Sequence, residues 1–216
     1  MKSGAIFDMD GLMFDSERLY QETWREIADR EGVVLGPHFT QDICGTSGDL
    51  LRSVVKKYYH TDNPDSLFQE CSSKVAEKMK DEVPMKPGLL ELLELFTASG
   101  VKLAVASSSK AELIEQNLSR SDTRHYFDKV VSGTFVEHGK PAPDIFLLAA
   151  KEIGCDPKDC YVFEDSINGV MAGLAAGCET IMVPDYIGPT ETVRNSEAHI
   201  CSSLSEAAQR IGSGEF

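Results

Sequence analysis

The sequence of 216 residues predicts an α/β fold: a doubly wound parallel sheet that is interrupted, after its first strand, by an inserted helical segment. Two patterns predict it. From residue 88 onward, short apolar runs alternate with stretches of helical spacing, which is the order of a parallel sheet with helices on both faces. Residues 15–82, by contrast, have helical spacing and no credible strand. We therefore expect a core of residues 1–14 and 84–216 and a helical cap of residues 15–83.

The first element expected is a buried strand at residues 2–7, which ends in the turn Asp8-Met9-Asp10-Gly11. Two carboxylates two positions apart leave a strand on the same side, and a glycine lets the backbone turn sharply beneath them. Converging carboxylates repel each other and attract a hard cation, and Mg²⁺ is the usual one near phosphate. The alternative is a strand end with ordinary acidic turn residues.

The inserted segment predicts a succession of helices. The first spans residues 16–31, with Ser16 as a fitting N-cap and Gly32 as a fitting end. Tyr20 and Trp24 have helical spacing in it. Either could face a substrate, but packing in the core of the insert is the better interpretation for Trp24. Two further helical stretches are expected at 47–60 and 65–82.

The rest of the chain predicts alternating helices and strands. In order, we expect a helix at 88–99, a strand at 101–106, a helix at 110–120, a strand at 129–132, a helix at 143–153, a strand at 160–163, a helix at 168–176, a strand at 180–183 and a strand at 198–201 followed by a helix. Ligands of such sheets bind outside the carboxyl ends of the strands. The connections near 13–17 and 82–87 are expected to act as hinges, since the second is rich in proline.

Polar side chains follow several of these strands at the expected ligand-binding edge. Ser107-Ser108-Ser109 follows the strand at 101–106, and Glu164-Asp165 follows the strand at 160–163. Lys140 lies in a turn that opens a helix. Together with Asp8 and Asp10 this set suits phosphoryl transfer, because carboxylates hold Mg²⁺ while the cation and a lysine neutralise the phosphoryl oxygens. A hydroxyl and loop amides can bind those oxygens, and a carboxylate can attack phosphorus to form an aspartyl phosphate.

Each of these motifs also has an ordinary structural explanation. The serines could cap a helix, Lys140 could be a solvated loop lysine, and Glu164-Asp165 could cap the helix at 168. Their occurrence in order on strand ends of one expected sheet favours chemistry.

The composition and net charge argue against several classes of binding partner. The net charge of −14 argues against nucleic acid and against anionic membrane surfaces. No apolar stretch approaches the roughly 20 residues that span a bilayer, and Asp8 comes too early for a signal peptide. The six cysteines form no C-x-x-C motif and have no zinc-finger spacing. We expect reduced thiols, a cytoplasmic location and a monomer that acts on a small molecule.

The chain resembles the haloacid dehalogenase (HAD) superfamily, in the branch with a small helical cap inserted after the first motif. The four motifs that carry the resemblance are Asp8-Met9-Asp10-Gly11, Ser107, Lys140 and Glu164-Asp165. The segments around Lys140 and Glu164 are similar to the subgroup that holds β-phosphoglucomutase and the sugar-phosphate and pseudouridine-phosphate phosphatases. The resemblance implies a Rossmann-like core.

The resemblance also implies roles for the strand-end residues. Asp8 is expected to be the nucleophile, and Asp10 the general acid that protonates the leaving oxygen and then the base that activates water. Mg²⁺ is expected to be held by Asp8, the backbone carbonyl of Asp10 and Asp165, with Glu164 near or at the metal.

Ser107 and the amide of Ser108 are expected to bind the phosphoryl oxygens, and Lys140 to bridge nucleophile and phosphate. Substrate selection is expected from the cap, through Tyr20 and the loop residues Gly45, Thr46 and Ser47.

The harder distinction is between a phosphatase and a mutase. The mutase resemblance predicts a histidine where Tyr20 stands and an arginine where Gly48 stands, and loss of that arginine removes a bidentate phosphate contact. We therefore expect a Mg²⁺-dependent phosphatase of a small phosphorylated metabolite, either a sugar phosphate or a nucleoside monophosphate. The alternatives are a β-phosphoglucomutase-like isomerase and a non-catalytic regulator that binds a phospho-ligand.

Overall fold

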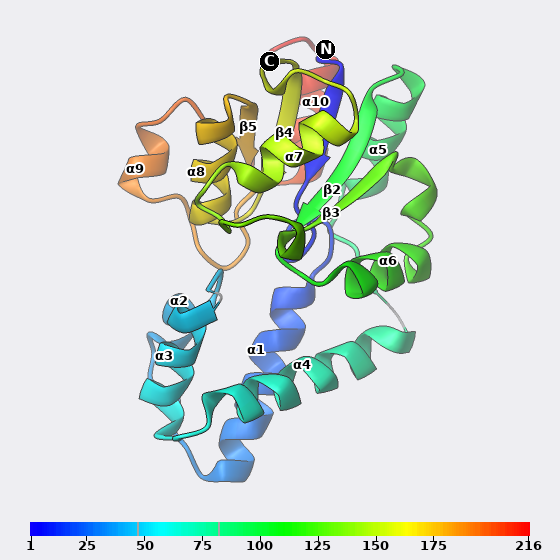
Figure 1. The fold of residues 1–216 in the computed structure, drawn as a ribbon. Helices are drawn as coiled ribbons and strands as arrows, with labels where there is room; N and C mark the ends of the chain where they lie inside the picture. The colour runs from blue at the N-terminus through cyan, green and yellow to red at the C-terminus, as the bar shows by residue number, and fades with distance from the viewer. Residues whose placement is uncertain (47, 82) are drawn as a thin grey trace.

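The strands predicted from the sequence form one parallel sheet in the order β3-β2-β1-β4-β5-β6 (Figure 1). The computed structural model of the protein describes residues 1–46, 48–81 and 83–216. The strands are β1 Gly4–Phe7, β2 Lys102–Ser107, β3 Lys129–Ser132, β4 Cys160–Glu164, β5 Glu179–Met182 and β6 His199–Ile200. The helices are α1 Ser16–Glu31, α2 Phe39–Ile43, α3 Gly48–Tyr59, α4 Pro64–Asp81, α5 Leu89–Ala98, α6 Ala111–Arg120, α7 Asp144–Glu152, α8 Ile167–Ala176, α9 Glu191–Arg194 and α10 Leu204–Gly212. The doubly wound α/β fold class is confirmed.

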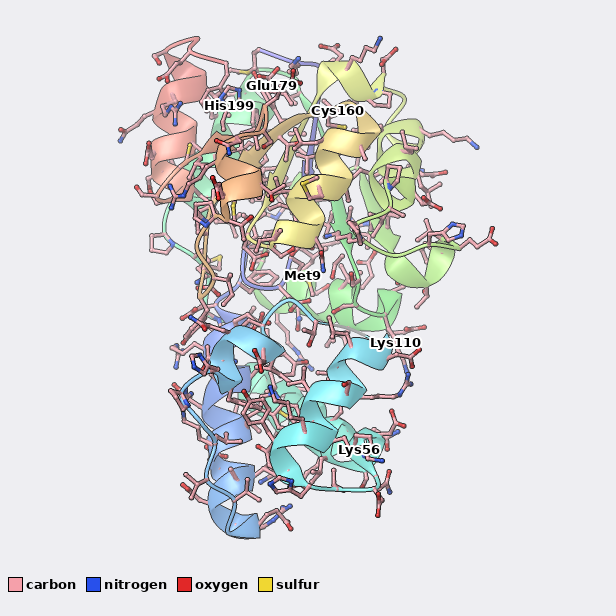
Figure 2. The ribbon with its side chains drawn as sticks, turned by 90° about the vertical axis from the view of Figure 1, so that its left-hand side faces the viewer. Met9, Lys56, Lys110, Cys160, Glu179 and His199 are labelled. Carbon is pink, nitrogen blue, oxygen red and sulfur yellow. The ribbon has the colours of Figure 1, made fainter. Side chains whose placement is uncertain are left out.

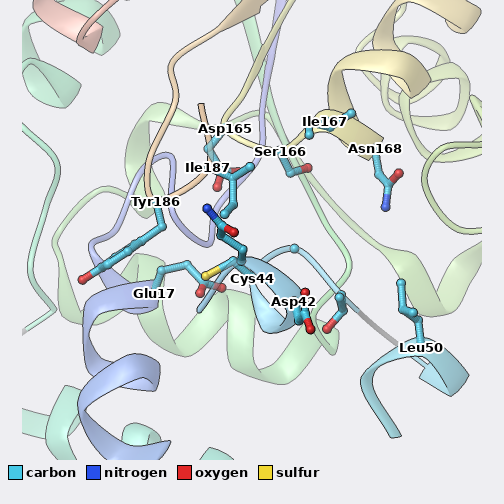
Figure 3. Close-up of a pocket in the computed structure, with 13 residues that line it drawn as sticks. Glu17, Asp42, Cys44, Leu50, Asp165, Ser166, Ile167, Asn168, Tyr186 and Ile187 are labelled. Carbon is cyan, nitrogen blue, oxygen red and sulfur yellow. The ribbon is translucent and has the colours of Figure 1, made fainter. Parts of the chain in front are cut away.

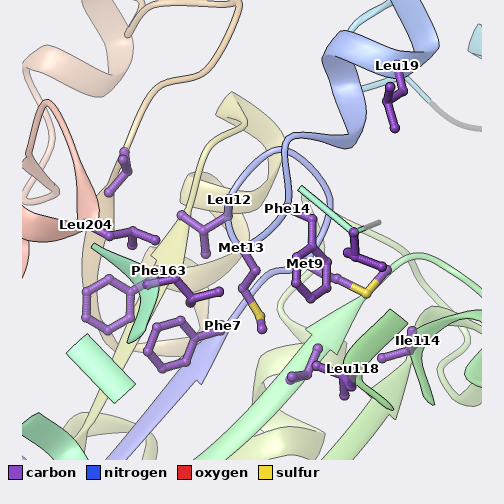
Figure 4. Packing of buried hydrophobic residues seen from close by; sticks show 14 of the residues in the cluster. Phe7, Met9, Leu12, Met13, Phe14, Leu19, Ile114, Leu118, Phe163 and Leu204 are labelled. Carbon is purple, nitrogen blue, oxygen red and sulfur yellow. The ribbon is translucent and has the colours of Figure 1, made fainter. Parts of the chain in front are cut away.

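Successive side chains of the central strand β1 point to opposite faces of the sheet, and helices cover both faces, so the side chains are buried on both sides. Ala5 and Phe7 belong to the larger apolar cluster with α5, α6 and α10, whereas Ile6 belongs to the second cluster with α7 and α8. Phe7 stacks on Phe163 of β4 with ring centroids 4.7 Å apart. Figure 4 shows this packing continuing into the turn after β1. The turn that carries the acidic residues is therefore anchored by buried side chains.

The helical insert lies beyond the carboxyl ends of the strands. Figure 2 shows Cys160, Glu179 and His199, at the starts of their strands, far from the insert, whereas Met9, just after β1, lies beside it. Within the insert, α1 packs along α4. Trp24 is only 2% exposed, as expected for a core residue, and it packs against Phe39 and Tyr59.

The two connections between core and insert pair with each other. The amide of Asp15 donates to the carbonyl of Pro84 at 2.8 Å, and the amide of Lys86 donates to the carbonyl of Met13 at 2.9 Å. The ammonium of Lys86 also lies 3.0 Å from the carboxylate of Asp15 and 2.7 Å from that of Asp185, in the loop after β5. One lysine thus joins both connections to a core loop.

Several details differ from the sequence-based expectation. Ser16 is not the N-cap of α1; Asp15 occupies that position without a side-chain cap hydrogen bond. The physical reason is a tertiary contact, since the hydroxyl of Ser16 donates to Asp10 at 3.0 Å. The one-turn helices α2 and α9 were not predicted. Strand ends shift by one or two residues, because the parallel partner decides where a ladder begins, as where Gly4 pairs with Lys102. No described helix is long and apolar enough to cross a membrane.

Candidate active site

Asp8 lies directly after β1, and its carboxylate contacts a buried lysine. The amide of Asp8 donates to the carbonyl of Phe163 at 3.0 Å, which fixes the chain as it leaves the sheet. The ammonium of Lys140 lies 2.5 Å from Oδ1 of Asp8 and 2.5 Å from Oε1 of Glu164. Burial alone would lower the pKa of Lys140, but the charges of these two carboxylates raise it. Lys140 is therefore a buried cation between two acids, which corrects the alternative of a solvated loop lysine.

Glu164 is fully buried, and both its oxygens already have donors. Besides Lys140 on Oε1, its Oε2 accepts from the amides of Asp165 and Ser166 at 3.1 and 3.0 Å and from the hydroxyl of Ser166 at 3.0 Å. A Cβ on Gly169 would lie 1.9 Å from its carboxyl carbon, so any larger residue there would force this carboxylate to move. Glu164 therefore orients Lys140 and the start of α8 as well as adding negative charge.

Three carboxylates meet at this edge. Asp8, Glu164 and Asp165 each offer an oxygen within 4.8 Å of the others. Burial raises the pKa of Asp8 to about 8, and the charge of Glu164 adds to the rise. Burial also raises the pKa of Asp165 well above its ordinary value, with further contributions from Glu164 and Asp8. Asp165 is pressed against Gly11, where φ is +84° and a Cβ would lie 2.5 Å from Oδ2.

The donor set fits a hard divalent cation. Converging carboxylate oxygens are the ligands that Mg²⁺ prefers, and Lys140 alone does not balance three acids. Burial is the main cause of the raised pKa values of Asp8 and Asp165, and the neighbouring carboxylates add to it; a bound cation would favour the ionised forms.

Asp10 stands apart from this cluster. Its carboxylate accepts from Ser16 at 3.0 Å, from Ser109 at 2.8 Å and more weakly from Ser107 at 3.4 Å. Burial raises the pKa of Asp10, although these hydroxyls oppose the shift. The Asp10 carboxyl therefore favours its protonated form, is oriented by hydroxyls and lies outside the group of three carboxylates.

The loop after β2 lies beside Asp10. The hydroxyl of Ser107 accepts from the amide of Ser109 at 3.1 Å, so the loop closes tightly on itself. Ser108 packs against Gly133, where a Cβ would lie 3.0 Å from its Cα. The loop therefore brings the predicted Ser107 next to Asp10, together with Ser109, while Ser108 lies against Gly133.

A pocket of about 280 Å³ opens between this edge and the insert (Figure 3). Gly45 and Thr46 line it, as expected for cap residues, whereas Ser47 lies outside the described residues. Tyr20 is not among the described lining residues; its hydroxyl lies 3.4 Å from that of Ser72 on α4. The substrate-binding role of Tyr20 stays a prediction.

Sequence reasoning missed most of the pocket. The residues not anticipated are Glu17, Gln41, Asp42, Cys44, Leu50, Ser166, Ile167, Asn168, Tyr186 and Ile187. One signal was present, because Glu17 lies one helical turn before Tyr20 and so on the same face of α1. The others come from segments far apart in the sequence, and no local pattern indicates that they meet.

Comparison with known proteins agrees with this geometry. The haloacid dehalogenase-like hydrolase family model matches residues 5–183. The fructose-1-phosphate phosphatase of Escherichia coli (strain K12) is 32% identical over 182 residues, which cover 84% of this chain and 96% of that protein. A Drosophila melanogaster protein named "Probable pseudouridine-5'-phosphatase" is 34% identical over 187 residues, covering 84% of this chain and 81% of that protein.

Solved structures show the same fold. A candidate β-phosphoglucomutase from Thermotoga maritima matches with a TM-score of 0.79 and 28% identity over 99% of both chains. A HAD family hydrolase from Deinococcus radiodurans R1, with bound phosphate and sodium, matches with a TM-score of 0.78 and 25% identity over 99% of this chain and 96% of that one. With the residues of its four motifs gathered at one edge of the sheet, the chain belongs to the haloacid dehalogenase-like hydrolases.

Proposed function

We propose that the protein is a Mg²⁺-dependent phosphatase that hydrolyses a small phosphorylated metabolite through an aspartyl phosphate. The observation that carries the proposal is the set of buried charges at the end of β1, where the carboxylate of Asp8 lies 2.5 Å from Lys140 and within 4.8 Å of oxygens of Glu164 and Asp165. The named activities of relatives, which include a fructose-1-phosphate phosphatase and a phosphorylated carbohydrates phosphatase, support it.

In this proposal Asp8 is the nucleophile. One carboxylate oxygen attacks phosphorus, the bond to the leaving oxygen breaks, and the phosphoryl group is carried on Asp8 until water releases it. Mg²⁺, held by Asp8, the backbone carbonyl of Asp10 and Asp165 with Glu164 beside it, would neutralise charge on the phosphoryl oxygens. Lys140 keeps Asp8 in place and faces the same oxygens, and Ser107 and the amide of Ser108 bind them.

Asp10 serves as acid and then as base. Burial raises the pKa of its carboxyl, which favours the proton that the leaving oxygen needs. After that proton is given up, the same carboxylate can take one from the water that attacks the aspartyl phosphate. The hydroxyls of Ser16 and Ser109 hold it in one orientation through both steps.

We further propose that residues 15–83 act as a cap domain on a core of residues 1–14 and 84–216. The paired connections between them would let the cap close over the substrate and exclude water from the reacting phosphate. Gly45, Thr46, Ser47 and Tyr20 are the cap residues proposed to contact the substrate. The chain is proposed to act as a monomer in the cytoplasm on a small molecule, without nucleic acid or membrane as a partner.

A phosphatase is favoured over a mutase. A mutase must hold a second phosphate in the cap, and no Lys, Arg or His is among the described residues that line the pocket. Gly48, at the position where the mutase resemblance predicts arginine, offers no side chain. Without a contact that retains a second phosphate, no sugar phosphate stays bound to compete with water for the aspartyl phosphate.

The test is phosphate release from a generic ester, p-nitrophenyl phosphate, with Mg²⁺ and with EDTA. We expect turnover only with the metal, and none from Asp8→Asn, which keeps the shape but removes the attacking charge. Asp159→Asn, an exposed residue at the opposite end of the sheet, is the matched control and should behave as wild type. Metal-independent turnover, or a folded Asp8→Asn variant with substantial activity, would contradict the proposal.

A further inference from the structure

The pocket between the sheet edge and the insert adjoins the candidate active site through Asp165, one of the three carboxylates that meet at that edge. Asp165 and Ser166 form the side next to the reacting carboxylates, and the opposite side comes from the insert, through Glu17, Cys44 and Thr46 (Figure 3). A phosphate at Asp8 would therefore direct its ester substituent into this space.

The charges that line the pocket are all of one sign. Glu17, Asp42 and Asp165 are the charged side chains among its described lining residues, and Ser47, the neighbour of Thr46, is uncharged. Asp42 is already compensated, because the ammonium of Lys57 lies 2.7 Å and the hydroxyl of Tyr58 2.8 Å from its Oδ2. Glu17 has no ion pair within 4.0 Å among the described residues, so it is the uncompensated acid of the insert's side.

Glu17, in the first turn of α1, faces the loop after α2, and that loop is joined to α1 through Gln21. Gln21 is a buried residue one turn further along α1. Its side-chain Nε2 donates to the sulfur of Cys44 at 3.2 Å, and its side-chain Oε1 accepts from the hydroxyl of Thr40 at 2.8 Å. Cys44 lies next to Glu17 in Figure 3. Burial raises the pKa of the Glu17 carboxyl to about 7, and the charge of Asp10 adds to the rise. An acid with this pKa can accept from, or donate to, a neutral hydroxyl.

The remaining lining combines neutral polar groups with apolar surface, which is the larger part of the lining. Asn168 and Gln41 supply amides, Thr46 and Ser166 supply hydroxyls, and Ile187 and Tyr186 supply apolar contacts. The volume of about 280 Å³ is the space of roughly nine water molecules at about 30 Å³ each, which is the scale of one monosaccharide.

We infer that this pocket takes an uncharged, hydroxyl-rich alcohol of monosaccharide size as the leaving group, that Glu17 recognises its hydroxyls, and that the pocket rejects a second anionic group. The inference rests on the proposed function and makes it more specific. A second phosphate or a carboxylate on the substrate that came near Glu17 would meet an acid without an ion pair and no cation in the described lining. Discrimination of this kind comes from the unfavourable contact with the wrong substrate.

The experiment compares kcat/KM for three esters. Fructose 1-phosphate and fructose 1,6-bisphosphate differ only in the second phosphate, and p-nitrophenyl phosphate carries no hydroxyls. We expect wild type to prefer the monophosphate over the bisphosphate by roughly tenfold or more. Glu17→Gln should reduce kcat/KM for fructose 1-phosphate about tenfold more than for p-nitrophenyl phosphate. Glu22→Gln, the same change at an exposed position of α1, should leave all three values unchanged.

A second variant covers the case in which Glu17→Gln does not fold. Asn168 is exposed at the start of α8, and Asn168→Arg adds the cation that the pocket lacks. It should raise the ratio of bisphosphate to monophosphate turnover by roughly tenfold.

The outcomes separate the inference from the proposed function. Equal turnover of monophosphate and bisphosphate by wild type, equal effects of Glu17→Gln on every ester, or an unchanged ratio in Asn168→Arg would overturn the inference while Mg²⁺-dependent phosphatase activity stands. A nucleoside 5′-monophosphate that is turned over roughly tenfold faster than fructose 1-phosphate would overturn it too. Absence of turnover of any ester would overturn the proposed function itself.

Discussion

Neighbouring side chains decide the chemistry of the two aspartates at the sheet edge. Asp8 and Asp10 are two residues apart in sequence, yet their surroundings differ: Asp8 faces a lysine and two further carboxylates, whereas Asp10 faces three serine hydroxyls. The same type of side chain can therefore serve as nucleophile at one position and as acid–base group at the other. The sequence predicted both residues, but not the hydroxyls of Ser16 and Ser109 that hold Asp10.

Replacing Asp10 tests its acid–base role. Asp10→Asn keeps the contacts with the serine hydroxyls but cannot give or take the proton. We expect the rate to fall roughly 10²–10⁴-fold for a sugar phosphate, the usual weight of acid–base catalysis. The loss should be smaller for p-nitrophenyl phosphate, whose leaving group needs no proton. The measurement is the steady-state rate of Asp10→Asn relative to wild type on each of the two esters. Equal losses of rate would mean that Asp10 does not protonate the leaving group.

Gly169 tests the packing of Glu164. Gly169→Ala would place a Cβ 1.9 Å from the carboxyl carbon of Glu164, and the crowded carboxylate would have to move. We expect a loss of roughly 1–3 kcal/mol in the free energy of unfolding, measured by urea denaturation. Gly212→Ala, in the last turn of α10 with nothing within 4 Å, is the matched control and should stay within about 0.5 kcal/mol of wild type. Equal stability of the two variants would show that Glu164 is not confined as described.

At the scale of elements, the sequence predicted the strands and helices that a local pattern of residues determines. Buried runs such as residues 4–7 and 160–164 indicate strands, and the polar residues that follow them reach one edge because parallel strands end together. The helices α2 and α9 escaped prediction because one turn is too short to show helical periodicity. The pocket residues Tyr186 and Asn168 escaped because only the meeting of insert and core brings them near Glu17.

The connections between insert and core provide an element-scale prediction. Lys86→Met would leave Asp185, whose side chain is 11% exposed, without the cation 2.7 Å away. We expect a loss of roughly 1–3 kcal/mol, the usual cost of a buried polar group without its partner. Adding Asp185→Asn should recover part of that loss, because the unpaired charge is then gone. Urea denaturation of the two single variants and the double variant measures the interaction energy between Lys86 and Asp185. Losses that simply add in the double variant would contradict this interaction.

At the scale of the whole molecule, a strongly acidic protein is proposed to act on an anionic substrate. The net charge of −14 repels phosphate, and three of the carboxylates that contribute to it are concentrated at the edge of the sheet. In the proposed function, a bound divalent cation and Lys140 would reverse the field locally, where the phosphoryl group would bind. Metal binding, stability and activity should therefore change together.

Stability as a function of pH tests this link. In the cation-free protein the pKa of Asp8, about 8, exceeds its ordinary value of about 4. The unfolded state therefore loses this proton at lower pH than the folded state does, and the free energy of unfolding falls as the pH rises toward 8. Mg²⁺ binds the ionised form and competes with this proton. We expect the rise in Tm on adding Mg²⁺ to be larger at pH 8 than at pH 5.5, and to be abolished by Asp165→Asn. A larger rise at pH 5.5 would contradict the proposed ligands.

The covalent role of Asp8 is the central claim, and trapping the phosphorylated enzyme tests it most directly. A single turnover with excess enzyme, Mg²⁺ and fructose 1-phosphate is quenched in acid, digested and analysed by mass spectrometry. We expect a transient phosphoryl group on the peptide that contains Asp8, formed before free phosphate appears and absent from Asp8→Asn. Phosphate release at the full wild-type rate with no phosphorylated Asp8 at any time would contradict the account.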